Sequence, residues 1–445
     1  MLATLKQRYL PQLDKLAGEL HFRVAIAVVL VAFNIFAFAK AGHERLEQPF
    51  KASPDAPHYS DPDAPSVAVR GPRQPHHWSR LVVSRWDAQH YIGFAIRGIT
   101  ACPTDPDQAT DLQYTDCGVA WFPGYGLAAG EVTDIVDVPA DYVLVVMSCL
   151  AALVLNLLWT SKTLTDRLGR GAAYAALFAF NLYPTAFLVV TPYPEAAIAA
   201  LTLGGFLCVA KDRWVWAGVL VGAATALSPS AVGIGFGLVA AALAAAATRH
   251  QEKVARWWRP LCAIPLAIWG VALTFLAYRI FLGDAWVYFR AQHPFTAGMP
   301  DLGLKPLVEP SFWIKGFTSQ NLPMLGIAGG LAAVAMCGKE LGKRFGRDEL
   351  MFLAVSCAIV LVRELAVIAA RGGGYWQLGP LVLGCPIFFL ALGLVARRHL
   401  AVYVFWLAIS LGLYWHVELC GYIAQGDPRI CPCEGHLEAW MPYES

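Results

Sequence analysis

Long apolar stretches dominate this chain and leave it few ways to fold. Of its 445 residues, 57% are hydrophobic and 15% are charged, whereas soluble domains carry roughly 25% charged residues. Stretches of about 20 apolar residues cross a bilayer as helices, which pair every backbone N–H and C=O internally. The sequence therefore predicts an all-α integral membrane protein. Its net charge of +2 gives no indication of nucleic-acid binding.

The apolar stretches predict about eleven transmembrane helices. About three of them share residues 194–248, where Lys211–Arg213 and Ser228-Pro229-Ser230 interrupt the apolar run. The rest fall near residues 22–40, 141–160, 171–191, 260–282, 321–337, 350–370, 376–395 and 399–420. The stretch 22–40, the first along the chain, lacks a small-residue cleavage site, so we expect it to be retained as a span.

Basic residues between these stretches predict the orientation. Positive charge gathers in the loops that remain in the cytoplasm. With the predicted spans, every basic cluster falls on the same side, which we interpret as cytoplasmic. The clusters are Lys6, Arg8, Lys15 and Arg23; Lys162, Arg167 and Arg170; Lys211 and Arg213; Arg249, Lys253, Arg256 and Arg259; Lys339, Lys343, Arg344 and Arg347; and Arg397 and Arg398.

The predicted organisation is lopsided, with short inner loops and long outer ones. A cytoplasmic segment, 1–21, precedes a membrane domain, 22–420, and an outer tail, 421–445, follows. The domain has two large outer loops, 41–140 and 283–320, and we expect interfacial helices in the first. The aromatic, acidic, amide and proline residues of the outer loops place the expected function on that face.

Outer cysteines favour disulfides over a metal site. Cys102 and Cys117 flank a polar part of the first outer loop and could pair in an oxidising compartment. Cys431-Pro-Cys433, with His436 nearby, has poor spacing for zinc, so a disulfide or free thiols are favoured there. We expect no metal site and no cofactor.

The segment Ser84-Arg85-Trp86-Asp87-Ala88-Gln89-His90-Tyr91 carries the first candidate site. Asp87 and His90 are one helical turn apart, and Trp86 and Tyr91 are suited to the lipid boundary. A carboxylate with basic and aromatic neighbours just outside a span can act on a lipid-borne substrate. The same pattern matches a capping box in which Asp87 reaches back to Ser84, and taken alone it favours that cap.

Two further outer segments carry acids. Glu195, in Tyr193-Pro194-Glu195, opens a span, where a carboxylate is favourable on helix-dipole grounds alone or marks a site. The segment 283–293 contains Asp284 and Gln292 among aromatic residues. It is either a binding segment or a membrane-surface helix, with Asp284 as a cap and Gln292 facing solvent.

Two arginines near the end of the chain allow functional and structural readings. Arg371 precedes a glycine run and Tyr375, and it is suited to a phosphate or to snorkelling at a span end. Arg363-Glu364 lies inside a predicted span. A charged pair there is costly and indicates either a function or a buried ion pair.

The aromatic stretch 118–126 suggests an interfacial turn, although taken alone it is more typical of an aromatic belt at the membrane boundary.

The order of these motifs resembles the PIG-V family, the GPI-anchor second mannosyltransferases and their bacterial relatives. The motifs are Trp86-Asp87-Ala88, an aromatic Phe122-Pro123-Gly124-Tyr125 turn, Asn181-Leu182-Tyr183-Pro184, Tyr193-Pro194-Glu195, Gly283-Asp284-Ala285 with Gln292, and Arg371 with Tyr375. The resemblance covers roughly residues 80–395 and implies an integral-membrane glycosyltransferase with a GT-C-like helical bundle.

The resemblance implies transfer of a sugar, expected to be mannose, from a polyprenyl-phosphate donor to a hydroxyl of a lipid or glycan acceptor, with inversion. Asp87 is the expected general base. Arg371, Arg85 and His90, in that order, are the expected donor-phosphate ligands. The expected substrate-binding residues are Trp86, Tyr91, Glu195, Asp284, Gln292 and Tyr375.

The chain departs from the family pattern at two places. Ser228-Pro229-Ser230-Ala231 stands where relatives commonly have Arg-Pro-Thr-Gly, and Pro194 replaces the usual serine of Tyr-Ser-Glu. Another group must then hold the donor phosphate, or the donor differs.

Two other readings stay open. A flippase for a lipid-linked saccharide would explain Arg363-Glu364, although the chain shows no repeated halves. An inactive partner subunit would explain the missing arginine. The outer loops contain no Asn-x-Ser/Thr, which favours a bacterial plasma membrane over the endoplasmic reticulum.

Overall fold

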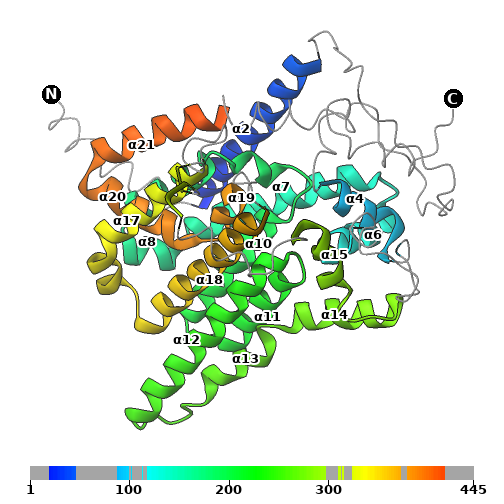
Figure 1. The fold of residues 1–445 in the computed structure, drawn as a ribbon. Helices are drawn as coiled ribbons and strands as arrows, with labels where there is room; N and C mark the ends of the chain where they lie inside the picture. The colour runs from blue at the N-terminus through cyan, green and yellow to red at the C-terminus, as the bar shows by residue number, and fades with distance from the viewer. Residues whose placement is uncertain are drawn as a thin grey trace.

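All regular structure in the described part of the chain is helical (Figure 1). The computed structural model describes residues 20–46, 88–99, 102, 113, 118–296, 309–311, 313–314, 323–371 and 378–415. The helices are α2 (Leu20–Leu46), α4 (Ala88–Arg97), α6 (Gly124–Val136), α7 (Ala140–Trp159), α8 (Lys162–Leu168), α9 (Arg170–Asn181), η2 (Ala186–Val190), α10 (Glu195–Val209), α11 (Trp214–Thr225), η3 (Pro229–Ala231), α12 (Val232–Gln251), η4 (Arg259–Cys262), α13 (Ala263–Leu266), α14 (Trp269–Leu282), α15 (Val287–Thr296), α17 (Pro323–Arg344), α18 (Arg347–Arg371), α19 (Leu378–Leu383), α20 (Pro386–Arg398) and α21 (Leu400–Leu413).

The predicted all-α membrane class is confirmed. Among the described residues, 6 helical segments are long and apolar enough to cross a membrane, and α10, α11 and α21 are shorter apolar helices. The long segments are Leu20–Lys40, Ala140–Trp159, Pro229–Gln251, Arg259–Leu282, Leu325–Arg344 and Arg347–Ile368. Each coincides with a predicted span. Length and composition thus support six spans among the described residues, and the expected total of about eleven stays a prediction.

Large apolar side chains cover the outside of the bundle. Leu276 and Ile280 of α14 are exposed, as are Val402, Phe405 and Ile409 of α21. Soluble monomers rarely present such continuous apolar surface, because its contact with water is unfavourable. Lipid tails are the surroundings that suit these faces.

The predicted span 171–191 is wrong as a single helix. Helix α9 ends at Asn181, and the short η2 is the regular structure that follows before α10. Pro184 has no N–H to donate and disfavours helical backbone at the residue before it. Tyr183, Phe187 and Tyr193 are nevertheless buried. Irregular backbone at membrane depth is tolerated where protein surrounds it, as here.

The predicted span 376–395 is also divided. The described residues form α19 and α20, and Pro386 begins α20. Proline suits the first turn of a helix because its missing N–H would have no partner within the helix there. The apolar stretch therefore bends between two helices instead of continuing as one.

Small residues let the central helices approach closely. At Gly222 of α11 a Cβ would overlap the Leu266 carbonyl oxygen and the Trp269 ring, and at Gly270 of α14 it would overlap the Gly222 carbonyl oxygen. Where α12 meets α18, a Cβ at Gly237 would overlap the Ser356 side chain. Close backbone approach is the usual basis of helix association in lipid, where burial of apolar surface gives little driving force.

Buried amides join three helices in the interior. Asn181 Nδ2 of α9 donates to Asn156 Oδ1 of α7 at 2.9 Å. Asn156 Nδ2 in turn lies 3.4 Å from the Ala27 carbonyl oxygen of α2. Tyr414 donates to Asn34 Oδ1 of α2 at 2.9 Å, which ties the end of α21 to the same helix. These side chains are buried and provide hydrogen-bond partners for one another in the interior.

The basic loops predicted to share one side do meet at one end of the bundle. Arg23 of α2 donates to Thr160 Oγ1, at the end of α7, at 3.1 Å. Arg167 of α8 forms an ion pair with Glu349 at the start of α18. Arg344, near the end of α17, donates to the carbonyl oxygen of Arg167.

Further contacts extend this basic end. Arg398 of α20 pairs with Glu340 of α17 at 2.6 Å. Arg249, at the end of α12, pairs with Asp212 in the turn between α10 and α11. The chain thus brings its inner-loop charges together, and the starts of α10 and α12 and the later part of α18 point to the opposite end. Which end faces the cytoplasm stays a prediction from the charge distribution.

The contact between α11 and α14 gives a test of this packing. We expect Gly222→Ala to lower the free energy of unfolding by about 1–3 kcal/mol, because the added Cβ meets backbone that cannot move aside. Thermal unfolding in detergent would measure the change.

Gly342→Ala is the matched control, since nothing lies within 4 Å of a Cβ at Gly342 of α17. Alanine favours helix over glycine, so this variant should be as stable as the wild type or slightly more stable. Equal unfolding temperatures for Gly222→Ala and the wild type would contradict the packing argument.

Candidate functional site

A buried turn holds α4, α14 and α15 together. Within residues 118–122, Trp121 stacks on His90 of α4, with ring centroids 3.6 Å apart and 14° between the planes. Tyr278 of α14 donates to the Trp121 carbonyl oxygen at 3.2 Å, and Gln292 Nε2 of α15 donates to the Ala120 carbonyl oxygen at 2.8 Å. The turn is packed inside the protein, so the reading of an aromatic belt facing lipid is wrong.

His90 is uncharged at neutral pH. Burial, and secondarily the charge of Arg97, lower the pKa of His90 from 6.5 to about 3. Burial also lowers the pKa of Arg97 to about 10, which still leaves that side chain charged. His90 can therefore contact a phosphate only as a neutral hydrogen-bonding group. The positive charge that the sequence analysis expected from His90 must come from another residue.

Tyrosines connect α4 and α6 to the start of α10. The ring of Tyr91 meets those of Tyr125 and Tyr193 edge to face, at 5.9 and 6.2 Å between centroids. The Tyr125 hydroxyl lies 2.6 Å from Ser148 Oγ of α7, and Ser148 Oγ donates to the Tyr193 carbonyl oxygen at 3.2 Å. Burial raises the pKa of Tyr125, and the nearby carboxylate of Glu195 adds to this effect.

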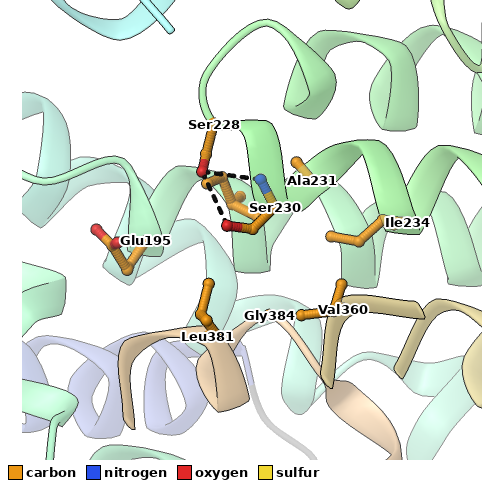
Figure 2. Close-up of a pocket in the computed structure, with 9 residues that line it drawn as sticks. Glu195, Ser228, Ser230, Ala231, Ile234, Val360, Leu381 and Gly384 are labelled. Carbon is orange, nitrogen blue, oxygen red and sulfur yellow. Dashed lines mark hydrogen bonds between the residues drawn. The ribbon is translucent and has the colours of Figure 1, made fainter. Parts of the chain in front are cut away.

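Glu195 lines a small pocket beyond these tyrosines (Figure 2). The pocket volume is about 20 Å³, which is room for about one water molecule. Ser228 and Ser230 supply its other polar groups. The apolar lining consists of Ile198, Ala231, Ile234, Val360, Leu381 and Gly384.

The Ser228-Pro229-Ser230 turn shapes this pocket because it caps a helix. Ser228 Oγ accepts a hydrogen bond from the Ser230 N–H at 3.3 Å, and Pro229 occupies the first turn of η3, which leads into α12. Serine and proline at these positions are favoured helix starts. The capping geometry leaves both hydroxyls beside the pocket.

A charged network extends from Ser230. Its hydroxyl donates to Glu364 Oε1 at 3.3 Å and accepts from Arg363 Nη1 at 3.3 Å. Arg363 forms an ion pair with Glu364 and donates from Nη2 to the Tyr288 hydroxyl at 3.1 Å. The pair expected from the sequence is therefore real, and it lies next to the pocket of Glu195.

Several expected site residues have structural roles or lie outside the described residues. Asp284 Oδ1 accepts from the Trp286 N–H at 2.8 Å, so Asp284 caps the turn before α15. Gln292 binds a backbone carbonyl, as above, and does not face solvent. Arg371 ends α18, without a described side chain, and Arg85, Trp86, Asp87 and Tyr375 lie outside the described residues.

Sequence reasoning placed Tyr125 in a motif and Tyr288 in an aromatic segment but gave neither of them, nor Ser148, a role in the site. Their contacts join segments far apart in the chain, for example 75 positions between Tyr288 and Arg363. A serine inside an apolar span was the one available signal for Ser148. Cys102 is disulfide-bonded, as its loop position allowed, but Cys117 lies outside the described residues.

Comparison of the chain with known protein families, with curated proteins and with solved structures found no match. The resemblance to the PIG-V family therefore stays a prediction from the motifs. A carboxylate and two hydroxyls beside a space of this size can receive one hydroxyl group of a polyol.

The neutral state of His90 predicts a pH dependence of stability. The unfolded chain binds a proton at His90 below the ordinary pKa of 6.5, and the folded protein does so only near 3. Acidification through this window therefore favours unfolding, by up to about 1.4 kcal/mol per pH unit. The His90→Phe variant keeps an aromatic ring against Trp121 but has no proton to bind.

We expect the unfolding temperature of the wild type to fall more steeply than that of His90→Phe between pH 7 and pH 4. Thermal unfolding at several pH values would measure the difference between the two curves. Parallel curves would contradict the lowered pKa.

Proposed function

We propose that this protein is a membrane glycosyltransferase that moves a sugar, expected to be mannose, from a polyprenyl-phosphate donor to a hydroxyl acceptor on the extracytoplasmic face. The observation that supports it best is the pocket of Glu195, Ser228 and Ser230 beside Arg363 and Glu364. It combines groups for sugar hydroxyls with a cation, at the bundle end opposite the basic loops.

The proposed chemistry needs a base and an anion-stabilising group. The acceptor oxygen forms a bond to the anomeric carbon, and its proton passes to a carboxylate. The bond from that carbon to the phosphate oxygen breaks, and the electron pair stays on the lipid phosphate. A positive side chain stabilises the charge that develops there. Attack from the side opposite the leaving group inverts the anomeric carbon.

Asp87 is the proposed base. It directly precedes Ala88, the first described residue of α4. That helix carries His90 and Tyr91 into the region of Tyr125, Tyr193 and Glu195. A base at this position would act at the outer boundary of the membrane, where a lipid-linked donor presents its sugar.

Two alternatives remain as proposals. The Arg363–Glu364 pair inside a candidate span favours a flippase for a lipid-linked saccharide, since charged pairs in membranes often mark transport pathways. The pocket lies toward one end of α10 and α12, whereas transporter sites lie near the midplane. An inactive partner subunit would bind the same substrates without transferring sugar.

Sugar transfer from radiolabelled polyprenyl-phosphate mannose to membrane lipids tests the proposal. We expect Asp87→Asn to lower the rate about 100- to 10,000-fold, as loss of a general base does. Asp166→Asn is the matched control. Asp166 pairs with Lys162 on the exposed face of α8 at the basic end, and its loss should leave transfer unchanged.

Transfer that is equal in Asp87→Asn and wild type would remove Asp87 as the base. No transfer by the wild type from mannose or other polyprenyl-phosphate sugars would overturn the enzyme proposal. In that case, movement of a labelled lipid-linked saccharide across proteoliposomes would test the flippase alternative.

Transfer should not depend on a divalent metal ion. A lipid monophosphate leaving group needs less charge compensation than a nucleotide diphosphate, and a protein cation can supply it. We expect the rate to be unchanged by a chelator. Loss of transfer in chelator, with recovery on adding a divalent ion, would contradict this prediction.

A further inference from the structure

The ion pair of Arg363 and Glu364 lies inside α18, in the candidate span Arg347–Ile368. Its side chains are 31% and 7% exposed. Charged groups at such positions are costly and persist where they do something or are firmly paired. A neutral pair of apolar residues would serve packing equally well.

Three elements hold the Arg363 guanidinium in one orientation. Ser230 of η3 accepts from Nη1, Tyr288 of α15 accepts from Nη2, and Glu364 of α18 supplies the opposite charge. The guanidinium is therefore fixed before any substrate arrives. Preorganised donors of this kind bind anions without first having to lose side-chain freedom.

We infer that Arg363 binds the phosphate group of the polyprenyl-phosphate substrate, while the pocket of Glu195, Ser228 and Ser230 receives a hydroxyl of its sugar. This inference rests on the proposed function and deepens it. A guanidinium presents a planar fork of N–H donors that matches phosphate oxygens. The Arg363 side chain is 31% exposed, so it is not sealed inside the bundle.

The carboxylate of Glu195 explains why the phosphate binds beside the pocket and not in it. Two negative groups in one small cavity would repel each other, whereas a carboxylate accepts hydrogen bonds from sugar hydroxyls. Ser230 belongs to both parts, since it lines the pocket and also accepts from Arg363. The sugar and its phosphate can thus occupy adjoining positions.

A lipid phosphate fits this surrounding better than a free anion. The pocket that shares Ser230 is otherwise apolar, with Ile198, Ile234, Val360 and Leu381 in its wall. Arg363 approaches it from within a candidate span. A phosphate carried on a polyprenyl chain reaches such a position from the membrane, whereas inorganic phosphate would have to give up its water shell.

Direct binding tests the inference without relying on catalysis. Purified protein in nanodiscs would be titrated with radiolabelled undecaprenyl phosphate and, separately, with uncharged undecaprenol. The double variant Arg363→Gln with Glu364→Gln removes the cation and leaves no unpaired buried charge. We expect the wild type to prefer the phosphate, and this variant to bind it about 10-fold or more weakly, with undecaprenol binding unchanged.

Arg167 and Glu349 supply a matched control at the basic end. They are 27% and 6% exposed, close to the values for Arg363 and Glu364. Arg167→Gln with Glu349→Gln should keep the preference for undecaprenyl phosphate. Tyr288→Phe, which retains the charge but removes one contact of the guanidinium, should weaken phosphate binding without affecting undecaprenol.

The inference is overturned if the Arg363 double variant keeps the phosphate preference, or if both double variants lose it equally. Competition separates the possible sources of the phosphate group. Excess inorganic phosphate or phosphatidic acid that displaces undecaprenyl phosphate would overturn the assignment to a polyprenyl lipid.

The sugar-transfer assay is read separately from this binding assay. Wild type that binds undecaprenyl phosphate through Arg363 but transfers no sugar would overturn the proposed enzyme and support the binding site. Wild type that transfers sugar, with unchanged phosphate binding in the Arg363 variant, would support the enzyme and overturn the site.

Discussion

The need to pair every backbone polar group inside the protein is the constraint on which this structure depends. In apolar surroundings an N–H or C=O without a partner costs several kcal/mol, on the order of the total stability of many proteins. Helices meet this need residue by residue. They then pack through small residues, as at Gly222 and Gly270, and through amide contacts such as Asn156 with Asn181.

The same constraint explains where the candidate site lies. Helices stop at Pro184 and again before Pro229, because proline cannot continue a helix on its N-terminal side. At these breaks other groups must satisfy the backbone, and Ser228 does so for Ser230. The starts of α10 and η3 bring Glu195 and the two serine hydroxyls together at one end of the bundle. Polar chemistry in an apolar protein is thus found where its helices are interrupted.

Sequence reasoning was most accurate where one short stretch decides the outcome. Runs of apolar residues located the spans, because helix length against bilayer thickness is a local property. Basic clusters located one common end, confirmed by contacts such as Arg167 with Glu349. The prediction that Asp284 could be a cap depends on a local contact as well, because Asp284 accepts its hydrogen bond from the N–H of Trp286, two residues along the chain.

The sequence by itself determined the class of protein, its six long apolar helices, the common end of its basic loops and the presence of a charged pair at Arg363 and Glu364. The tertiary structure decided what these residues meet. It lowered the pKa of His90, whose ring stacks on Trp121, and it brought Arg363 to Ser230 across 133 positions of the chain. Burial and contacts between distant segments follow from packing the whole bundle, and no local pattern of residues encodes them.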